Sequence, residues 1–404
     1  MMPLPAAAPN QDGMRGLRSQ PVRLAVFTDY VYHQRGRELY AERAFALFLA
    51  RLGEHLDRLT LVGRLAPERA QATYRLPPEV RFVPLPYYPS LGRPLDGIRA
   101  LRGAMRRFWG ALDDVDGVWL LGPHPFTIPF VAIAALRGKR VILGVRQDFP
   151  SYLRGRHPDR PILRLIGFVL EVAHRLLARR FAIVAVGPDL ARRYRRARRV
   201  LEINVSLVER RDVINPGLEN TRSCEGELRL ISVGRLESEK NPLLLAEVLS
   251  RLTDDGRPWR LLVCGEGPMR DALDARLRDL GLADCAELRG YVPFGEGLLD
   301  LYRNSHALLH VSWTEGLPQV LIEAFATATP VVATDVGGVG EAVQGAALLV
   351  PPGDAQAAAV AVRAVVDDHE LRERLVQGGH RYALAHTAEA ETRRLAEFLQ
   401  EVLR

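Results

Sequence analysis

Short apolar runs alternate with amphipathic stretches along almost the whole chain. In the first half, the apolar runs predict strands at residues 23–28, 59–63, 80–85, 117–122, 140–145 and 181–186. In the second half, they predict strands at residues 228–233, 260–265, 286–290, 307–311, 330–335 and 347–350. Between the strands, apolar residues recur at helical spacing, for example over residues 39–53 and 162–178. Near-continuous apolar strands separated by amphipathic helices are typical of parallel sheets covered on both faces.

This alternation of strands and helices occurs twice, which predicts two doubly wound α/β domains. The separation falls within residues 215–227, where Pro, Gly and polar residues replace the periodicity. We therefore place a first domain at residues 23–215, a second at 216–385 and a further helical segment at 386–404. Residues 1–22 lack the apolar run of a signal peptide and are predicted to form a flexible tail.

Basic residues outnumber acidic ones, and almost all of the basic residues are arginine. Lys and Arg total 55 against 48 Asp and Glu, and the formal net charge of +7 indicates an anionic partner without choosing among phosphates, acidic lipids and nucleic acid. Only Lys139 and Lys240 are lysines. A lysine kept among arginines suggests a position that needs a compact ammonium rather than a planar guanidinium. The cysteines Cys224, Cys264 and Cys285 have no metal-binding spacing and fit a reduced cytosolic protein.

Patterns typical of metal, nucleic-acid or membrane-spanning sequences are weak. Asp114 and Asp116 form an Asp-x-Asp pair that precedes its predicted strand rather than following it, so no metal is expected. Basic residues are not interleaved with aromatic ones, so no nucleic-acid partner is expected. Residues 118–136 lack charged side chains, but a glycine and three prolines interrupt them, which favours a strand, a turn and a helix. The run Arg192 to Arg199 is either a solvated helix face or a contact with an anionic membrane surface or an acidic acceptor.

The loops that follow the strands of the second half are the candidate site, because open parallel sheets bind ligands at the carboxyl ends of their strands. After the strand at 228–233, Gly234 allows a turn, and Arg235 lies at the strand end. Lys240 precedes a helix predicted to be opened by Asn241 and Pro242. Two cations beside a helix N-terminus are what a diphosphate requires. Glycines that permit close backbone approach follow two other strands, at Gly265 and Gly267 and at Gly337, Gly338 and Gly340.

The loop after the strand at 307–311 is the most specific. Glu315 lies in this loop, Gly316 and Leu317 form its turn, and Glu323 lies within the next helix beside apolar neighbours. Carboxylates accept the hydrogen bonds that sugar hydroxyls donate. Glu315 and Glu323 are therefore predicted to hold two polyol groups along one ligand.

At these residues the chain resembles the retaining, nucleotide-sugar-dependent glycosyltransferases of family 4, which have the GT-B fold. The resemblance is carried by the E-x(7)-E spacing of Glu315 and Glu323, by "VGRLESEKNPLLLAEVL" and by "LVPPGDAQAAA". It covers residues 213–380. It implies two Rossmann-like α/β domains facing a cleft, with the helical segment at 386–404 bracing the first domain.

The resemblance also implies roles for the site residues. Arg235 and Lys240 would neutralise the donor diphosphate, and Glu315 would face the transferred sugar, so these three are the expected catalytic residues. Glu323 would hold the ribose hydroxyls. The full set expected to bind the donor is Gly234, Gly265, Gly267, Tyr291, Val292, Gly316, Leu317, Glu323, Gly337 and Gly338.

The first half resembles the family less closely. Family members often carry a glycine-rich loop after the first strand, where this chain has only Gly36. They often show a His-Asp pair where this chain has Gln147 beside Asp148. His124 also follows a predicted strand. The expected acceptor-side residues are Asp29, Gly36, His124, Gln147 and Asp148.

The function implied by the resemblance is transfer of a hexose, with retention, from a nucleotide sugar to a hydroxyl of a glycan, lipid-linked or small-molecule acceptor. Cationic side chains would stabilise the departing diphosphate, so neither a cofactor nor a metal is expected. We expect a role in cell-surface or exopolysaccharide glycan synthesis, in the cytoplasm or at the inner face of the membrane. Two other functions stay open, namely a nucleotide-sugar epimerase or hydrolase of the same fold and a non-enzymatic basic binding module.

Overall fold

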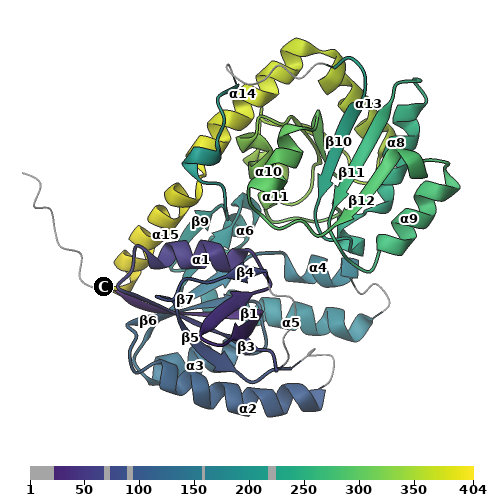
Figure 1. Cartoon of the computed structure of the whole chain (residues 1–404). Coiled ribbons are helices and arrows are strands. Elements are labelled where there is room, and N and C mark those ends of the chain that lie inside the picture. The colour runs from purple at the N-terminus through teal and green to yellow at the C-terminus, as the bar shows by residue number, and fades with distance from the viewer. Residues whose placement is uncertain (1–21, 68–72, 89–93, 157–159, 217–223) are drawn as a thin grey trace, which may run out of the picture.

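Two sheets, one in each half of the chain, organise the fold (Figure 1). The computed structural model describes residues 22–67, 73–88, 94–156, 160–216 and 224–404. Within these residues, the first sheet has nine strands and the second has six. Helices cover the sheets, so the prediction of two doubly wound α/β domains is confirmed (Figure 1). The expected tail at residues 1–22 lies outside the described residues except for Val22, which is buried.

The first sheet has a parallel centre in the strand order β4-β2-β1-β6-β7-β8-β9, with β3 pairing β1 and β5. Its strands are β1 Arg23–Arg35, β2 Glu38–Ala41, β3 Arg58–Leu65, β4 Tyr74–Arg75, β5 Arg81–Leu85, β6 Gly117–Gly122, β7 Arg140–Val145, β8 Ala182–Val186 and β9 Arg199–Ile203. Its helices are α1 Phe45–Gly53, α2 Pro94–Ala111, α3 Thr127–Leu136, α4 Phe149–Arg156, α5 Pro161–Ala178 and α6 Pro188–Arg193, followed by the 3₁₀ turn η2 Arg210–Asp212.

The second sheet is parallel throughout, in the order β12-β11-β10-β13-β14-β15. Its strands are β10 Leu228–Val233, β11 Trp259–Cys264, β12 Ala286–Gly290, β13 Ala307–His310, β14 Val331–Thr334 and β15 Leu348–Val350. Its helices are α8 Leu243–Thr253, α9 Arg270–Asp279, α10 Glu296–Arg303, α11 Gln319–Ala326, α12 Val339–Ala342 and α13 Ala355–Asp367, with 3₁₀ turns η3 Ser238–Lys240 and η4 Ala283–Cys285. Two further helices, α14 His369–Ala385 and α15 Ala388–Leu403, complete the chain.

Two local predictions are wrong. Residues 39–53 were expected to be helical throughout, but β2 occupies Glu38–Ala41 and α1 begins only at Phe45. The reason is that β1 runs on to Arg35 and turns through Gly36, whose φ of 61° suits a glycine, so that β2 pairs with it antiparallel. The arginine-rich run 192–199 is not one helix face either. Helix α6 ends at Arg193, and the chain then turns into β9.

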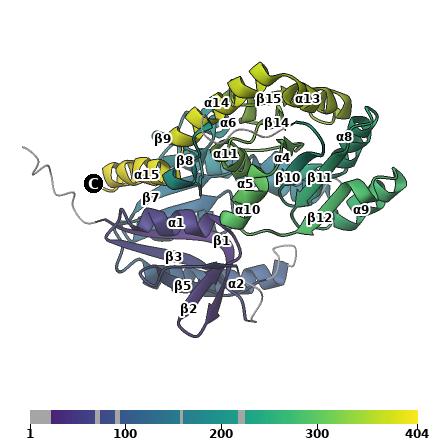
Figure 2. The same cartoon turned by 45° about the horizontal axis from the view of Figure 1, so that its top comes forward.

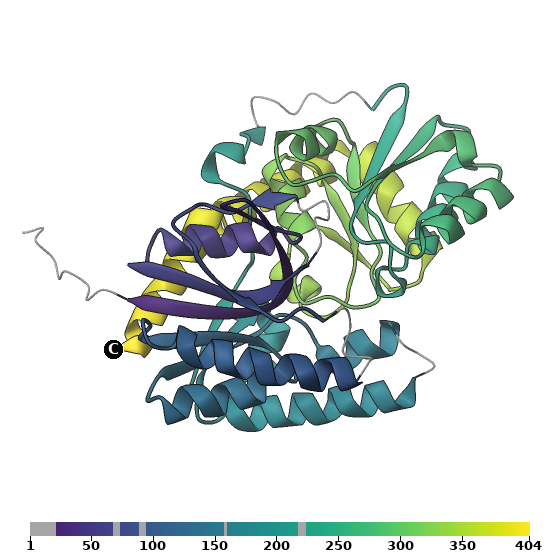
Figure 3. The same ribbon diagram turned by 60° about the horizontal axis from the view of Figure 1, so that its bottom comes forward.

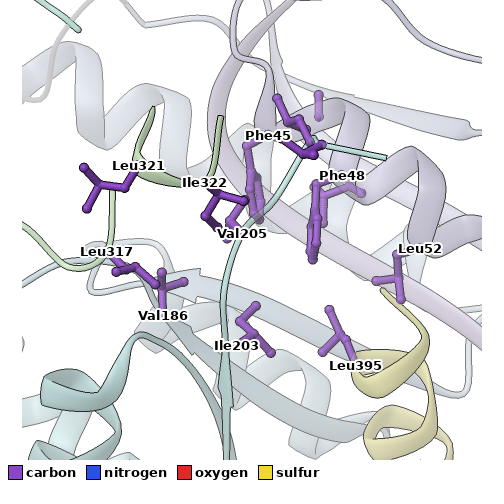
Figure 4. Packing of buried hydrophobic residues seen from close by; sticks show 14 of the residues in the cluster. Phe45, Phe48, Leu52, Val186, Ile203, Val205, Leu317, Leu321, Ile322 and Leu395 are labelled. Atoms are coloured by element: carbon purple, nitrogen blue, oxygen red, sulfur yellow. The ribbon is translucent and has the colours of Figure 1, made fainter. Parts of the chain in front are cut away.

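A buried cluster of apolar side chains joins the two halves of the chain. It contains Phe48 and Val186 from the first domain and Leu317, Ile322 and Leu395 from the residues that follow. Figure 4 shows these side chains converging from both domains. The domains therefore share a hydrophobic core, which fixes how the carboxyl ends of the two sheets lie relative to each other.

The last two helices pass from one domain to the other (Figure 2). Helix α14 packs on α11 of the second domain, whereas α15 packs on α1 and β9 of the first. The crossing is held by polar contacts, since the Ala388 amide donates to the Val208 carbonyl at 2.7 Å and the Asn204 amide donates to Glu391 Oε2 at 3.1 Å. Arg51 Nη2 lies 3.3 Å from Glu389 Oε1.

Leu395→Ala is expected to destabilise the protein, because Leu395 is fully buried where α15 meets the first domain. A buried Leu→Ala change costs about 2 to 5 kcal/mol through lost burial and the cavity left behind. Urea unfolding followed by circular dichroism measures this loss. The control is Val360→Ala on α13, where the side chain is 53% exposed and the expected change is within about 0.5 kcal/mol. Equal urea midpoints for the two variants would contradict the role of α15 in bracing the first domain.

Candidate functional site

The loop after β10 begins with a close approach of two backbones. A Cβ added to Gly265 would lie 1.7 Å from the Gly234 carbonyl oxygen, so only glycine fits at this position. The Gly234 amide donates to the Cys264 carbonyl at 3.0 Å, which holds the two strand ends together. Gly267 is restricted in the same way, because its Cβ would lie 2.4 Å from the Leu236 carbonyl oxygen. These glycines therefore allow the loops after β10 and β11 to pack side by side.

Arg235 and Lys240 lie on this loop in different surroundings. The Arg235 guanidinium is held by two carboxylates, with Nη1 2.6 Å from Glu237 Oε1 and Nη2 3.1 Å from Glu239 Oε1. Lys240 lies in η3, and its Nζ donates to Glu315 Oε1. Arg235, Lys240 and His310 line one narrow hollow of about 20 Å³. The structure thus brings the two predicted cations to one place.

The predicted cap of the next helix is wrong. Helix α8 begins at Leu243, and Asn241 instead ends η3 in a left-handed conformation with φ of 53°. The short side chain of asparagine tolerates this conformation better than most residues. The tight turn leaves Lys240 directed at the loop after β13 rather than at the start of α8.

Glu315 is a buried carboxylate with two partners. Its Oε1 also lies 3.0 Å from His310 Nε2, and its side chain is 9% exposed. Burial opposes ionisation, but the Lys240 ammonium and the His310 hydrogen bond outweigh it and hold the pKa of Glu315 well below its usual range. Glu315 is therefore ionised at every physiological pH and is neutralised by Lys240.

Glu323 is buried in α11 and has a different environment. The Tyr302 hydroxyl donates to its Oε2 at 2.9 Å, and the residue is 5% exposed. Burial raises the pKa of Glu323 to about 7, with the Tyr302 hydrogen bond opposing the shift. Glu323 also interacts electrostatically with Tyr291. The structure therefore brings Glu323 and Tyr291, both expected to bind the donor, into one neighbourhood.

Tyr291 connects the two domains. Its hydroxyl lies 2.6 Å from the hydroxyl of Tyr74 on β4, and the Phe294 amide donates to the same Tyr74 oxygen at 3.1 Å. Val292 is partly buried and packs against the cluster shared by the domains. The segment after β12 is thus fixed against the first domain.

The turn Gly316–Leu317 is packed between the domains. A Cβ on Gly316 would lie 2.8 Å from the Arg146 carbonyl oxygen, and one on Gly337 would lie 2.0 Å from the Glu315 carbonyl oxygen. A Cβ on Gly338 would lie 3.0 Å from the Gly316 carbonyl oxygen. Leu317 is buried, and Figure 4 shows it near Val186. The loop that carries Glu315 is therefore clamped between the second sheet and the first domain.

On the first domain, Asp29 belongs to a cluster of polar side chains at the carboxyl ends of the parallel strands. Arg146 Nη2 lies 2.9 Å from Asp29 Oδ1. Arg64 Nε donates to the Asp29 carbonyl at 3.0 Å, and its Nη1 donates to the Tyr88 carbonyl at 2.7 Å. His124 Nε2 lies 3.2 Å from the Tyr88 hydroxyl. This cluster joins Asp29, at the irregularity within β1, with Arg64 near the end of β3 and with residues from the loops after β5, β6 and β7.

His124 is neutral in this cluster. The Phe126 amide donates to His124 Nδ1 at 3.1 Å, so the ring proton lies on Nε2 and points toward Tyr88. Burial lowers the pKa of His124 to about 4, and the nearby Asp29 only partly opposes this shift. His124 can donate a hydrogen bond near neutral pH but carries no charge there.

The other expected acceptor-side residues lie in different places. Asp148 binds Arg193 at 2.7 Å and the Ser151 hydroxyl, and so ties α4 to α6. Gln147 follows β7 and is half-buried. Gly36 lies in the exposed turn of the β1–β2 hairpin, where a Cβ would meet nothing within 4 Å. Gly36 therefore has the role of a turn residue, away from the Asp29 cluster.

Four residues of the site were missed at the level of sequence: His310, Arg64, Tyr88 and Arg146. Each lies at the carboxyl end of a parallel strand or just after one, which is the position that marked the predicted residues. Arg146 directly precedes Gln147, and His310 ends β13. Among the described residues, no group of three His, Cys, Asp or Glu side chains is placed to hold a metal ion.

Comparison with known proteins agrees with this geometry. Residues 219–382 match the family described as "Glycosyl transferases group 1". These residues form a group 1 glycosyltransferase domain. The domain contains η3, the Glu315 loop and α11, so Arg235, Lys240, Glu315 and Glu323 all lie within it.

Similarity extends beyond the group 1 domain. A D-inositol 3-phosphate glycosyltransferase from Nocardia farcinica is 34% identical over 230 residues, which are 51% of this chain and 49% of the relative. The chain spans between 27% and 65% of the length of the first curated relatives that it matches.

No helix among the described residues is long and apolar enough to span a membrane.

Solved structures share the arrangement of both domains. Sucrose-phosphate synthase from Thermosynechococcus elongatus has a TM-score of 0.71 at 18% identity and covers 94% of this chain and 99% of its own. HepE from Anabaena, solved in complex with UDP-glucose, has a TM-score of 0.69 at 15% identity, with 94% and 100% covered. The predicted GT-B fold, with its group 1 domain as the second half, is thereby confirmed.

Glu323→Gln is expected to remove a pH-dependent loss of stability. The folded-state pKa of about 7 lies above the ordinary value of 4.5. The stabilising contribution of protonated Glu323 is therefore complete below pH 4.5 and is lost as the pH rises through 7. Between pH 5 and pH 8, the free energy of unfolding of the variant relative to that of wild type should rise by up to about 3 kcal/mol. Urea unfolding at a series of pH values measures this difference. The control is Glu370→Gln, at a side chain that is 88% exposed; a gain independent of pH would contradict the assignment.

Proposed function

We propose that the protein is a retaining glycosyltransferase that moves a sugar from a nucleoside-diphosphate donor to an acceptor hydroxyl. The observation that carries the proposal is the position of the Glu315 loop. On one side Glu315 binds Lys240, and on the other the adjoining Gly316 packs against the Arg146 carbonyl. Arg146 in turn pairs with Asp29 of the first-domain cluster. Donor-side and acceptor-side residues thus meet at one junction between the sheets.

The reaction needs stabilisation of a departing diphosphate. The bond from the anomeric carbon to the phosphate oxygen breaks, a bond from the acceptor oxygen to that carbon forms, and the acceptor proton passes to the departing phosphate. Lys240 and Arg235 would hold the negative charge that develops on the leaving group, as preorganised cations do most effectively where water is excluded. No separate protein base is required, because the leaving phosphate takes the proton.

The donor is proposed to be a nucleotide sugar held along the second sheet. Lys240 and Arg235 lie on one loop beside His310, and their charged side chains would bind the diphosphate. Glu323 is buried beside Tyr302 and near Tyr291, and in this proposal it would accept hydrogen bonds from ribose hydroxyls. That HepE was solved with UDP-glucose makes uridine nucleotides the first donors to test.

The acceptor is proposed to carry a negative charge beside its reacting hydroxyl. With His124 neutral, the first-domain cluster has two cations, Arg64 and Arg146, and one carboxylate, Asp29, which leaves one positive charge. Arg64 donates to backbone carbonyls, and these bonds do not cancel its charge. A phosphate-bearing or otherwise acidic glycan or lipid-linked acceptor fits this charge, in agreement with a role in cell-surface or exopolysaccharide synthesis.

The rival function of the same fold is a nucleotide-sugar epimerase or hydrolase. An epimerase converts the donor sugar without releasing nucleoside diphosphate, and a hydrolase releases it without any acceptor. Thermal-shift screening against UDP-, GDP- and ADP-sugars first identifies the donor, since a ligand that binds only the folded state raises Tm. Release of nucleoside diphosphate that depends on an added acceptor supports transfer over both rivals.

Lys240→Ala is expected to lower turnover by about 100-fold or more, because the leaving diphosphate loses a preorganised cation. Lys240→Arg should restore little activity, since a planar guanidinium does not replace a compact ammonium on Glu315. Nucleoside diphosphate release under saturating donor measures the effect.

The matched control for this prediction is Lys139→Ala. Lys139 is the other lysine of the chain, and its Nζ donates to the Val115 carbonyl at 2.8 Å, in the first domain. Its removal should leave turnover unchanged. Near-normal turnover in Lys240→Ala, with the fold intact by circular dichroism, would refute the catalytic role.

Arg64→Gln is expected to raise the KM for an acidic acceptor by about 10-fold, since a hydrogen bond to a charged group contributes about 1.5 kcal/mol. The donor-induced rise in Tm should stay as in wild type. Arg107→Gln is the control, because Arg107 also donates to a backbone carbonyl of the first domain, that of Pro84 at 2.7 Å. An equal KM change with a neutral analogue of the acceptor would argue against charge recognition.

A further inference from the structure

Helix α5 buries its polar face and exposes its apolar face, which is the reverse of an ordinary surface helix. Its buried positions are Gly167, Glu171, His174 and Ala178, which recur at the spacing of one helix face. The apolar residues lie on the opposite face, where Ile162, Leu165, Ile166, Phe168, Val169 and Leu176 are between 46% and 73% exposed. A sequence with this periodicity normally turns its apolar stripe toward the core.

The reversal is fixed by polar contacts on the inner face. Glu171 accepts hydrogen bonds from Arg175 Nε at 2.8 Å and from the Tyr194 hydroxyl at 3.0 Å. His174 packs edge-on against Tyr194, and burial lowers the pKa of His174 to about 4. These buried groups hold α5 in this rotation. The apolar stripe therefore faces outward in the folded protein.

The outward face is continuous with a strongly basic hollow. Val172 and Leu176 of α5 line a hollow of about 590 Å³ between α5 and α6. Its charged lining consists of Arg175, Arg179, Arg192, Arg193, Arg195, Arg196 and one acid, Asp189. Asp189 is already paired with Arg192 and Arg193, at 3.4 Å and 2.9 Å. Within the described residues, no carboxylate forms an ion pair with Arg179, Arg195 or Arg196.

An apolar face beside arginines is the pattern of a helix that lies in a membrane interface. Apolar side chains enter the boundary between headgroups and acyl chains, and arginines bind anionic headgroups. The only acid of α5, Glu171, is buried on the inner face, so no carboxylate of the helix opposes such contact. Figure 3 shows α5 as the long teal helix at the outer edge of the first domain, and its apolar side chains are exposed.

We propose that α5 and the adjoining arginine-lined hollow bind the surface of an anionic lipid bilayer, with α5 lying in the plane of the interface. A protein partner or a second copy is less suited to the site. Arg179, Arg195 and Arg196, which have no carboxylate ion pair within the described residues, lie beside the apolar stripe and call for a surface dense in negative charge. The proposal does not rest on the enzymatic function, since it depends only on residues of α5, α6 and the loop after α6.

Vesicle co-sedimentation of the full chain tests the proposal. Wild type should bind vesicles of phosphatidylcholine with phosphatidylglycerol, bind pure phosphatidylcholine weakly, and dissociate as salt screens the headgroups. Leu165→Asp combined with Val169→Asp should lower binding to the anionic vesicles by at least about 10-fold, because it places charges in the apolar face. Arg195→Glu combined with Arg196→Glu should do the same through lost headgroup contacts, at about 1 kcal/mol per arginine.

The matched controls lie on the second domain and on α14. Val360→Asp changes an apolar side chain that is 53% exposed, and Arg374→Glu changes an arginine whose side chain is 65% exposed. Both should bind vesicles as wild type does. All variants should keep the far-UV circular dichroism spectrum and the Tm of wild type, so that loss of membrane binding is distinguished from loss of the fold.

Three results would overturn the proposal. The first is wild type that fails to bind anionic vesicles at low salt. The second is a Leu165→Asp/Val169→Asp variant that binds as wild type does. The third is wild type that sediments as a dimer in the absence of lipid and becomes a monomer in this variant, without vesicle binding, because a second copy would then cover the face.

Discussion

The ion pair between Lys240 and Glu315 is the interaction on which the site depends. Glu315 is buried, and an unpaired carboxylate there would oppose folding strongly. Lys240 neutralises it and so allows the loop after β13 to lie in the interior, where Gly316 reaches the backbone of Arg146. The same contact therefore makes the loop stable and sets its distance from the first domain. Removing one partner alone leaves a buried charge without a counter-ion, and this destabilises the protein more than replacing both partners with apolar residues would.

A diphosphate that bound at Arg235 and Lys240 would meet charges that already have partners. Arg235 is held by Glu237 and Glu239, and burial with the neighbouring Glu237 raises the pKa of Glu239. Lys240, in contrast, has a flexible stem and can turn from Glu315 toward a phosphate oxygen. Binding would then redistribute existing charge rather than bring a new cation into the interior. Such a requirement would account for a lysine at this position in a chain that has only two lysines and is otherwise rich in arginine.

The second domain was more predictable from the sequence than the first. Its site residues lie in the loops after β10 and β13, so strand prediction alone places Arg235, Lys240 and Glu315 at one edge of a parallel sheet. In the first domain the cluster combines Arg64, Arg146 and others from strands similarly far apart in the sequence, but no sequence motif marks these residues. Periodicity also gave the bounds of α5 almost correctly, but it could not reveal that buried polar contacts turn the apolar stripe outward.

The outward stripe and the candidate site are linked through α4. This short helix packs against α5 on one side and against η3, which carries Lys240, on the other. Asp148 at the start of α4 is also tied to Arg193 at the end of α6, so α4, α5 and α6 form one unit. A bilayer bound to α5 would therefore lie at a fixed height relative to the junction of the two sheets. An acceptor hydroxyl attached to a lipid headgroup would then reach the junction from the membrane side, which restricts diffusion of the acceptor to a plane and favours its encounter with a bound donor.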